Sequence, residues 1–324
     1  MSYDRMGPPR TPRRGFGVFV TVLVLLFGGV AAWQGGALSL FRGKGDVAVA
    51  EPRTSPAGVV TSSPSPSSPS SSPSPAPAVV PGFTDAEVAA LDGIAATGLP
   101  VRCGGGTKPL VALTFDDGPG PYTEQAMTIL QDAGVKATFF LVGKKFTDEA
   151  EWDALLPDEV AAGAVGDHTW NHVYLPGSSQ ETLDKEVGAT MDAIEQATGS
   201  PVRLFRPPYG AHDPDLDAYV ESLGMVQVLW SIDSTDSAGA TAEEVYANVM
   251  AFVGPGSIVL LHENRGTTLS VLPQLLAAIK DKGLQPVTVP ELLVQDPPSL
   301  SQLETGDCGG HDSAHPEATG SPSQ

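Results

Sequence analysis

The sequence has few cysteines and few basic residues for its length, and both shortages exclude functions. Only 2 of its 324 residues are Cys, which excludes a disulfide-rich scaffold and most zinc sites built on thiolates. Lys and Arg total 18 against 38 Asp and Glu, for a net charge of −20. Nucleic acid is therefore not an expected partner, because phosphates are bound by clustered basic side chains.

The first 50 residues differ from the rest in charge and hydropathy. They contain six basic and two acidic side chains, and an uncharged apolar run follows three arginines. Its centre, residues 16–33, is about long enough to span a bilayer. This predicts a basic cytoplasmic segment at residues 1–15 and a membrane anchor at residues 16–36, with the remainder outside the cytoplasm. A cleaved signal peptide is the alternative, because the small residues 30–32 form an acceptable cleavage site.

A segment rich in Pro and Ser follows the apolar run. Residues 61–78 read TSSPSPSSPSSSPSPAPA and contain too few apolar side chains to form a core. Residues 37–82 are therefore predicted to be a disordered linker with a bias towards polyproline II. At ~3.1 Å per residue, such a linker is long enough to let a membrane-anchored catalytic domain work within a cell wall. The alternative is a simple spacer without that role.

The remaining chain has the composition of a globular domain. It divides into an N-terminal extension (83–107), a catalytic domain (108–298) and a tail (299–324), and Thr84 with Glu87 predicts a capping box for a first helix. Short buried strands are predicted at residues 110–115, 137–142, 165–168, 204–206, 226–232, 257–262 and 286–289. Helical patterns cover residues 86–94, 123–133, 180–197, 214–223, 242–252 and 269–282. This alternation predicts a parallel sheet with helices outside, either a barrel or a doubly wound fold.

Two adjacent carboxylates directly follow the first of these strands. Asp116 and Asp117 repel each other and lose hydration there, so their position suggests a bound cation. The alternative is structural, because the sequence Asp-Asp-Gly-Pro is also typical of a turn.

Two histidines strengthen the metal interpretation. His168 and His172 follow another predicted strand, and their spacing allows both imidazoles to meet on one helical turn and bind one ion. His311 and His315 have the same spacing but lie in a Gly/Ser/Pro-rich tail, where a solvated role is favoured. One carboxylate with two imidazoles leaves coordination positions open, as in catalytic zinc sites.

Polar residues also occur at three later strand ends. Arg206 and Tyr209 lie in LFRPPYG, Asp233 and Asp236 in VLWSIDSTDS, and His262 ends IVLLH. Each has a structural alternative: a surface arginine, capping aspartates and a buried strand-end histidine. Together they match the carboxyl ends of strands, where α/β barrels build their active sites.

These five motifs in this order resemble polysaccharide deacetylases of the NodB-homology type, carbohydrate esterase family 4. The matching residues are TFDDG, HTWNH, RPPY, WSIDSTD and LLH, spread over residues 108–296. The resemblance implies a distorted (β/α)7 barrel and hydrolysis of acetyl groups. It also implies one divalent metal ion, zinc or alternatively cobalt, bound by Asp117, His168 and His172.

The same resemblance implies a role for each remaining motif residue. Asp116 would be the general base, oriented by Arg206, and His262 the general acid, held protonated by Asp236. The Tyr209 N–H would help to bind the oxyanion. The substrate-contacting side chains would be Leu260, in the acetyl pocket, and the groove residues Pro208, Tyr209 and Trp230.

Two positions depart from the family pattern. Ser237 replaces the usual aromatic residue, so one wall of the groove lacks its flat apolar face and the preferred sugar chain is open. Asp167 replaces the usual Asn before the first metal histidine and is expected to add negative charge beside the metal.

The two cysteines bracket the domain. Outside the cytoplasm an oxidised pair is allowed, so a Cys103–Cys308 disulfide is our hypothesis, with two free thiols as the alternative.

The sequence thus predicts a monomeric, membrane-anchored, extracytoplasmic enzyme that removes N-acetyl groups from a cell-wall polymer, foremost peptidoglycan N-acetylglucosamine. Chitooligosaccharide deacetylation and acetylxylan esterase activity are alternatives within the same chemistry. A catalytically silent wall-binding module is the alternative from another class.

Overall fold

The computed structural model describes residues 82–148, 152 and 154–310. The predicted cytoplasmic segment, membrane anchor and linker, together with His311 and His315, lie outside these residues, apart from Gly82 at the linker's end. No helix within the described part of the chain is long and apolar enough to cross a membrane.

All strand pairs of the central sheet are parallel, in the order β5-β4-β3-β2-β1-β7-β6, with β8 also paired to β1. The strands are β1 (Leu110–Gly118), β2 (Ala137–Leu141), β3 (Gly163–Asp167), β4 (Leu204–Phe205), β5 (Val226–Gln227), β6 (Ile232–Asp233), β7 (Ile258–His262) and β8 (Gln285–Val287). The sheet is a curled half-barrel rather than a closed one, since β5 and β6 are its two ends. The prediction of a single strand over residues 226–232 was wrong. The start of this segment pairs with β4 as β5, and only its end pairs with β7, as β6.

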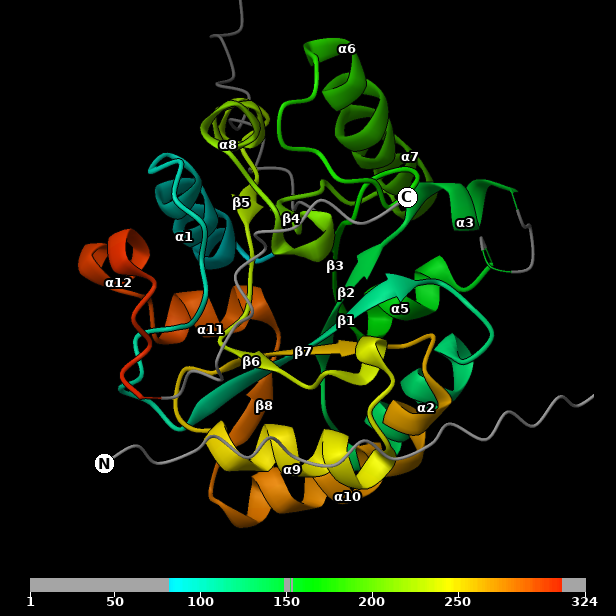
Figure 1. Cartoon of the computed structure of the whole chain (residues 1–324), viewed down its shortest axis with the longest axis vertical. Coiled ribbons are helices and arrows are strands. Elements are labelled where there is room, and N and C mark those ends of the chain that lie inside the picture. Colours follow the sequence, from blue (N-terminus) through cyan, green and yellow to red (C-terminus); the bar gives the residue numbers. More distant parts are fainter. Residues whose placement is uncertain (1–81, 149–151, 153, 311–324) are drawn as a thin grey trace, which may run out of the picture. The chain divides into compact units, whose positions relative to one another are not determined.

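Helices cover the sheet as the alternating pattern predicts (Figure 1). They are α1 (Asp85–Ala95), α2 (Thr123–Ala133), α3 (Gly143–Asp148), α5 (Leu156–Ala162), α6 (Gln180–Leu183), α7 (Ala189–Thr198), α8 (Pro214–Ser222), α9 (Ala242–Phe252), α10 (Gly266–Asp281), α11 (Val289–Gln295) and α12 (Leu300–Thr305). The capping box predicted at Thr84 and Glu87 is present at the start of α1. The short helices α3, α5, α11 and α12 were not predicted from the sequence.

The predicted helix over residues 180–197 is broken in its middle. A π-helical turn, Asp184–Gly188, separates α6 from α7. The extra residue in this turn places Glu186 against the histidine loop, where its carboxylate accepts hydrogen bonds from the Asn171 N–H and side-chain amide, both 2.9 Å long. Such π-helical turns are frequent at functional sites.

Alternation along β1 decides which side chains enter the half-barrel. Val111, Leu113 and Phe115 belong to the larger apolar core, whereas Leu110 and Ala112 belong to the second core, with α1, α11 and α12. Since successive strand residues point to opposite faces, Thr114 and Asp116 continue the second face. That face is therefore apolar at its amino end and polar at its carboxyl end.

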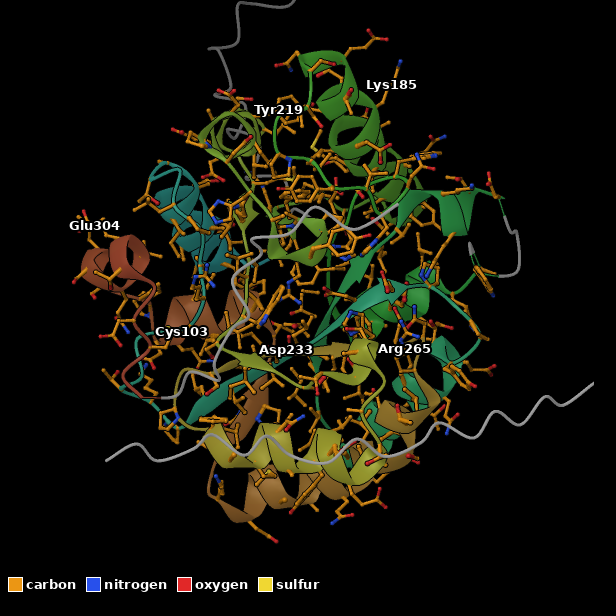
Figure 2. The ribbon with its side chains drawn as sticks, viewed as in Figure 1. Cys103, Lys185, Tyr219, Asp233, Arg265 and Glu304 are labelled. Atoms are coloured by element: carbon orange, nitrogen blue, oxygen red, sulfur yellow. A yellow bond between two sulfur atoms is a disulfide. The ribbon has the colours of Figure 1, made fainter. Side chains whose placement is uncertain are left out.

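Cys103 and Cys308 form a disulfide, with their Cα atoms 6.0 Å apart. It joins the segment before β1 to the segment after α12, whose Leu303 is buried in the second core. In Figure 2, Cys103 lies near α12 and far from Arg265, which follows β7. The bond therefore ties the two ends of the domain together away from the strand ends that carry the polar motifs.

Candidate metal centre and acid–base site

The carboxyl ends of β1, β3, β4 and β7 gather the residues singled out from the sequence. Asp116 of β1 lies in register with His262 of β7, and Asp167 of β3 with Phe205 of β4, which precedes Arg206. Parallel pairing places these ends at one edge of the sheet, so residues nearly 150 positions apart in the sequence become neighbours.

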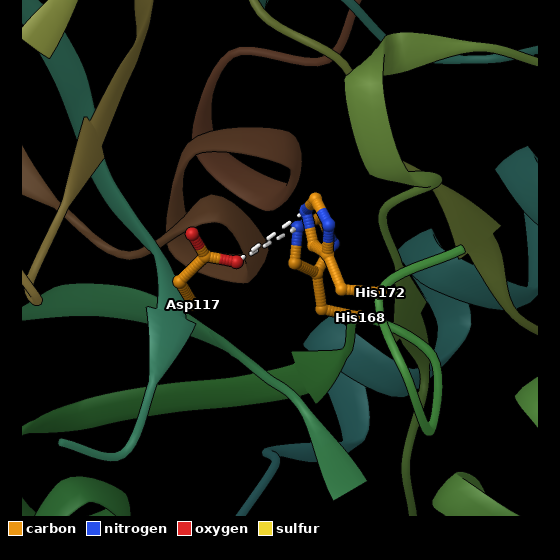
Figure 3. A group of neighbouring side chains, drawn as sticks. All are labelled: Asp117, His168 and His172. Carbon is orange, nitrogen blue, oxygen red and sulfur yellow. Dashed lines mark ion pairs between the residues drawn. The ribbon is translucent and has the colours of Figure 1, made fainter. Parts of the chain in front are cut away.

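Asp117, His168 and His172 converge with ligand-type atoms toward one another (Figure 3). Asp117 Oδ1 lies 3.9 Å from His168 Nε2 and 3.4 Å from His172 Nε2, and one ligand atom from each residue fits within 4.8 Å. One carboxylate oxygen and two imidazole nitrogens are a donor set that suits a divalent ion such as zinc. The three predicted ligands are therefore brought together.

The backbone at Asp117 explains how two consecutive carboxylates face the same site. Strand alternation alone would turn Asp117 away from Asp116. Asp117 has φ 66°, and the β1–β2 register shifts between Asp116 and Gly118. Such a bulge redirects a side chain. Lys145 donates a hydrogen bond to the Asp117 carbonyl and Asn264 Nδ2 to Asp117 Oδ2, at 3.2 Å.

The spacing alone suggested that the two histidines meet on one helical turn. In the structure they meet in a loop. Thr169 and His172 have φ 67° and 56°, which is outside right-handed helical geometry. The His172 N–H donates to Thr169 Oγ1 at 3.0 Å, and Glu186 holds the intervening Asn171. Contacts from a distant segment therefore replace the hydrogen bonds of a helix.

His168 is prepared for metal binding by its surroundings. Its Nδ1 lies 2.7 Å from the Arg206 carbonyl oxygen, which assigns the proton to Nδ1 and leaves Nε2 for a metal. Burial lowers the pKa of His168 to about 4, although Asp116 acts in the opposite direction. The imidazole is thus neutral near pH 7, the form that binds metals.

Arg206 fixes Asp116 from inside the domain. The guanidinium is fully buried and donates from Nη1 to Asp116 Oδ1 and to Thr114 Oγ1, each at 2.7 Å. Its other nitrogens donate to the Val228 and Leu229 carbonyls at 3.0 and 2.9 Å. Burial lowers the pKa of Arg206, and Asp116 opposes that shift. Asp116 is thereby held with Oδ2 free of Arg206, 3.6 Å from His168 Nε2.

His262 and Asp236 form a second buried pair. His262 Nδ1 lies 2.7 Å from Asp236 Oδ1, and the His262 N–H donates to Asp236 Oδ2 at 2.8 Å. The Thr268 hydroxyl donates to the same Oδ2. Burial favours neutral forms, but the mutual hydrogen bond and charge outweigh it, so the pKa of His262 is raised and the pKa of Asp236 is lowered. The raised pKa favours the protonated form of His262, which can donate a proton.

The predicted groove residues lie around this centre. Tyr209 is 51 % exposed and its ring contacts the edge of His172, with centroids 4.9 Å apart. Leu260 is buried on β7, two residues before His262 and on the same face. Trp230 covers Gly210 and lies 5.6 Å from the Arg206 guanidinium. Pro208 is buried beside Tyr209.

The surroundings of Asp167 oppose the negative charge expected at this position. Asp167 is fully buried; burial raises its pKa well above the usual value, more than the Thr169 N–H lowers it, and Glu186 raises it further. This disfavours the negative charge expected beside the metal residues. Ser237 is exposed in the turn Asp236–Ala238.

Three residues that were not predicted from the sequence stabilise the loops of the site. Lys145, Glu186 and Asn264 contact the loops of Asp117 and His172, and none belongs to a recognised motif. A signal was available for two of them, because Lys145 and Asn264 follow the carboxyl ends of β2 and β7. For Glu186, which sits in an unpredicted π-helical turn, no sequence signal existed.

Comparisons with known proteins agree with this geometry. The family model described as "Polysaccharide deacetylase" matches residues 104–228. A peptidoglycan-N-acetylglucosamine deacetylase of Bacillus cereus is 34 % identical over 194 residues, covering 57 % of this chain and 89 % of that protein. The peptidoglycan-N-acetylglucosamine deacetylase PgdA of Listeria monocytogenes is 34 % identical over 188 residues, but the match covers 57 % of this chain and only 39 % of PgdA.

The solved structures include a CE4 family pseudoenzyme of Bacillus anthracis. Its TM-score is 0.57 at 28 % identity, over 62 % of this chain and 70 % of that chain. Because this fold also occurs in a protein described as a pseudoenzyme, an argument about activity depends on the side chains of the site.

Proposed function

The chain belongs to the polysaccharide deacetylase family, and from this premise we propose that it hydrolyses N-acetyl groups on peptidoglycan N-acetylglucosamine with a bound divalent metal. The observation that carries the proposal is the arrangement of Asp116 and His262. Each is buried beside the three ligand-type residues and is held by a partner of opposite charge, Arg206 or Asp236. Simple binding of a polymer requires no such pair.

Asp117, His168 and His172 would hold the metal, with zinc as the proposed ion. The fit rests on the convergent ligand atoms and on the neutral His168, whose Nε2 faces Asp117 while Nδ1 is engaged by the Arg206 carbonyl. When bound, such an ion lowers the pKa of water and polarises a carbonyl oxygen. Asn264 would keep the second oxygen of Asp117 oriented.

Asp116 would act as the general base. Its carboxylate accepts the proton of the attacking water at Oδ2, since Oδ1 is occupied by Arg206. The Arg206 charge stabilises the ionised carboxylate before the reaction, and its rigid hydrogen bonds fix the direction of Oδ2.

His262 would act as the general acid. After water adds to the amide carbonyl, cleavage of the C–N bond requires a proton on the departing nitrogen, and protonated His262 supplies it from Nε2 while Asp236 holds Nδ1. The products are acetate and a free amine on the sugar. Leu260 would contact the acetyl methyl, and Tyr209, Pro208 and Trp230 the sugar.

We further propose that the enzyme acts outside the cytoplasm, anchored through residues 16–36. The disulfide supports an oxidising compartment, and the family relatives named as peptidoglycan deacetylases support a substrate there. Fractionation of cells followed by N-terminal sequencing tests the anchor: the intact N-terminus is expected in the membrane fraction, and a chain beginning near residue 33 would show cleavage instead.

The test of the activity is acetate release by the purified full-length chain. Metal-free protein is supplied with zinc or cobalt and incubated with peptidoglycan, chitooligosaccharides or acetylxylan, measuring acetate and new free amines together. Zinc-dependent formation of both from peptidoglycan is expected, with loss in D116N and in H262N. D215N, an exposed aspartate of α8, is the matched control. Acetate without amine would indicate an esterase, and no acetate from any substrate would indicate a binding module.

A further inference from the structure

Two buried glutamates adjoin the acid–base site without taking part in the proposed steps. Glu159 of α5 and Glu263, the residue after β7, are each 0 % exposed. A Cβ atom placed on Gly118 would lie 1.4 Å from Glu263 Oε1 and 3.3 Å from Glu159 Oε1. Both carboxyl groups therefore reach the backbone immediately after Asp117.

The pair has few hydrogen-bond donors around it. Of the described residues, only Thr123 donates, through its hydroxyl to Glu263 Oε2, and neither oxygen of Glu159 nor Glu263 Oε1 receives a donor. The Oε1 atoms of both glutamates lie within 3.3 Å of one point beside Gly118, so the two carboxyl groups are close neighbours. Since two carboxyl oxygens can bond to each other only through a proton, a hydrogen bond between these neighbours requires one protonated glutamate.

Burial is the main factor that favours retention of that proton. Burial raises the pKa of each glutamate, and for Glu159 the charge of Glu263 raises it further. Lys145 of α3 acts on Glu263 in the opposite direction, and Asp117 of β1 in the same direction as burial. No cation is paired directly with either carboxyl group among the described residues, so full ionisation would leave two adjacent buried charges.

The pair also links the two loops of the site. Thr123, which donates to Glu263, accepts a hydrogen bond from the Gly120 N–H at 2.8 Å, and the Glu263 N–H lies 3.4 Å from the Asp116 carbonyl oxygen. Glu263 directly follows His262 in the sequence. Displacement of the glutamates would therefore move the loop of Asp116 and Asp117 relative to His262.

We propose that Glu159 and Glu263 share a proton and act as a positioning pair that fixes the general base and the general acid relative to each other. The positioning role rests on the proposed deacetylase function, whereas the shared proton does not. Glu159 is thus a positioning residue, because no hydrogen bond or ion pair joins it to the metal-ligand residues in the part of the chain that the structure describes.

The shared proton is tested by stability, which requires no substrate. A carboxyl group protonated in the folded state and ionised in the unfolded state contributes stability at low pH that is lost as pH rises. Between pH 5 and 8 the stability of the wild type should therefore fall more steeply than that of E159Q. The two slopes should differ by up to about tenfold in the unfolding constant per pH unit. D158N, an exposed neighbour on α5, should parallel the wild type. Equal slopes for E159Q and wild type would overturn the shared proton.

The positioning role is tested by rescue. E159L removes the hydrogen bond, and we expect at least a tenfold lower kcat with little change in KM. E159Q, whose amide still donates to Glu263, should remain within about threefold of wild type. If E159L does not fold, the metal-dependent activity of E159Q at pH 8 tests the positioning role instead. An E159Q activity more than tenfold below that of D158N would overturn the role. A folded E159L with wild-type kcat would also overturn it, whereas an inactive wild type would instead refute the proposed function.

Discussion

Replacement of Asp236 by Asn is the sharpest test of the acid–base assignment. Three donors converge on the two carboxylate oxygens of Asp236: the His262 N–H, His262 Nδ1–H and the Thr268 hydroxyl. An asparagine has the same shape but offers one oxygen and two N–H groups. At least one of the three donors must then face an N–H group, and the negative charge that stabilises protonated His262 is lost.

The size of the effect follows from these contacts. A hydrogen bond to a charged group contributes about 1.5–3 kcal/mol, and one pKa unit corresponds to about 1.4 kcal/mol. The D236N change should therefore lower the pKa of His262 by about 1–2 units. Burial, which lowers the pKa of His262, would then act without the opposition of Asp236. Above both pKa values, the protonated fraction of His262 and hence kcat should fall about 10- to 100-fold.

The pH dependence of kcat shows in which direction the pKa of His262 moves in D236N. The pKa of His262 is raised in the folded wild type, so both its acid role and its contribution to stability are present at low pH and are lost as pH rises through that pKa. The alkaline limb of kcat should therefore move to lower pH in D236N, with the loss of activity smaller at pH 5.5 than at pH 8. Acetate release measured from pH 5 to 9 provides the profile, with D215N as the control. An unchanged alkaline limb would refute the role of Asp236.

Three further predictions concern the metal, the buried arginine and the disulfide. H172A should weaken zinc binding by more than about 100-fold in a calorimetric titration, whereas H212A, which removes an imidazole paired with Asp217, should bind zinc as the wild type does. R206M should abolish acetate release and cost about 3–5 kcal/mol of unfolding free energy, because it leaves Asp116 buried without its cation; R206K should recover little, since Lys lacks the planar fork. The double variant C103S/C308S should lose about 2–5 kcal/mol in urea unfolding, as should the reduced wild type. Equal zinc affinities for the two His variants, an active R206M, or stability unaffected by reduction would contradict these expectations.

The sequence was most informative where chemistry and strand ends coincide. The runs before Asp116 and His262 are apolar and short, and their alternation with helices predicted a parallel sheet whose carboxyl strand ends carry the polar residues. The structure places the predicted metal residues within reach of one another for this reason. The fold was less predictable where strands are very short: β5 and β6 hold two residues each, and hydrophobicity alone does not reveal that the chain crosses the open side of the sheet between them.

The loops around the site could not be predicted because long-range contacts decide their conformation. The described residues other than glycine with positive φ are Asp117, Thr169, His172, Tyr209 and Thr235, and all five lie near or after the carboxyl ends of strands. Asp117 is the second-last residue of β1 and the other four lie in connections after strands. Such conformations cost about 1–3 kcal/mol each and persist only where the surroundings enforce them. Lys145 holds the Asp117 carbonyl and Glu186 holds the histidine loop, so the enforcement comes from α3 and the π-helical turn. Local propensity favours other conformations at these positions, and the side-chain directions needed for chemistry therefore depend on residues that no motif includes.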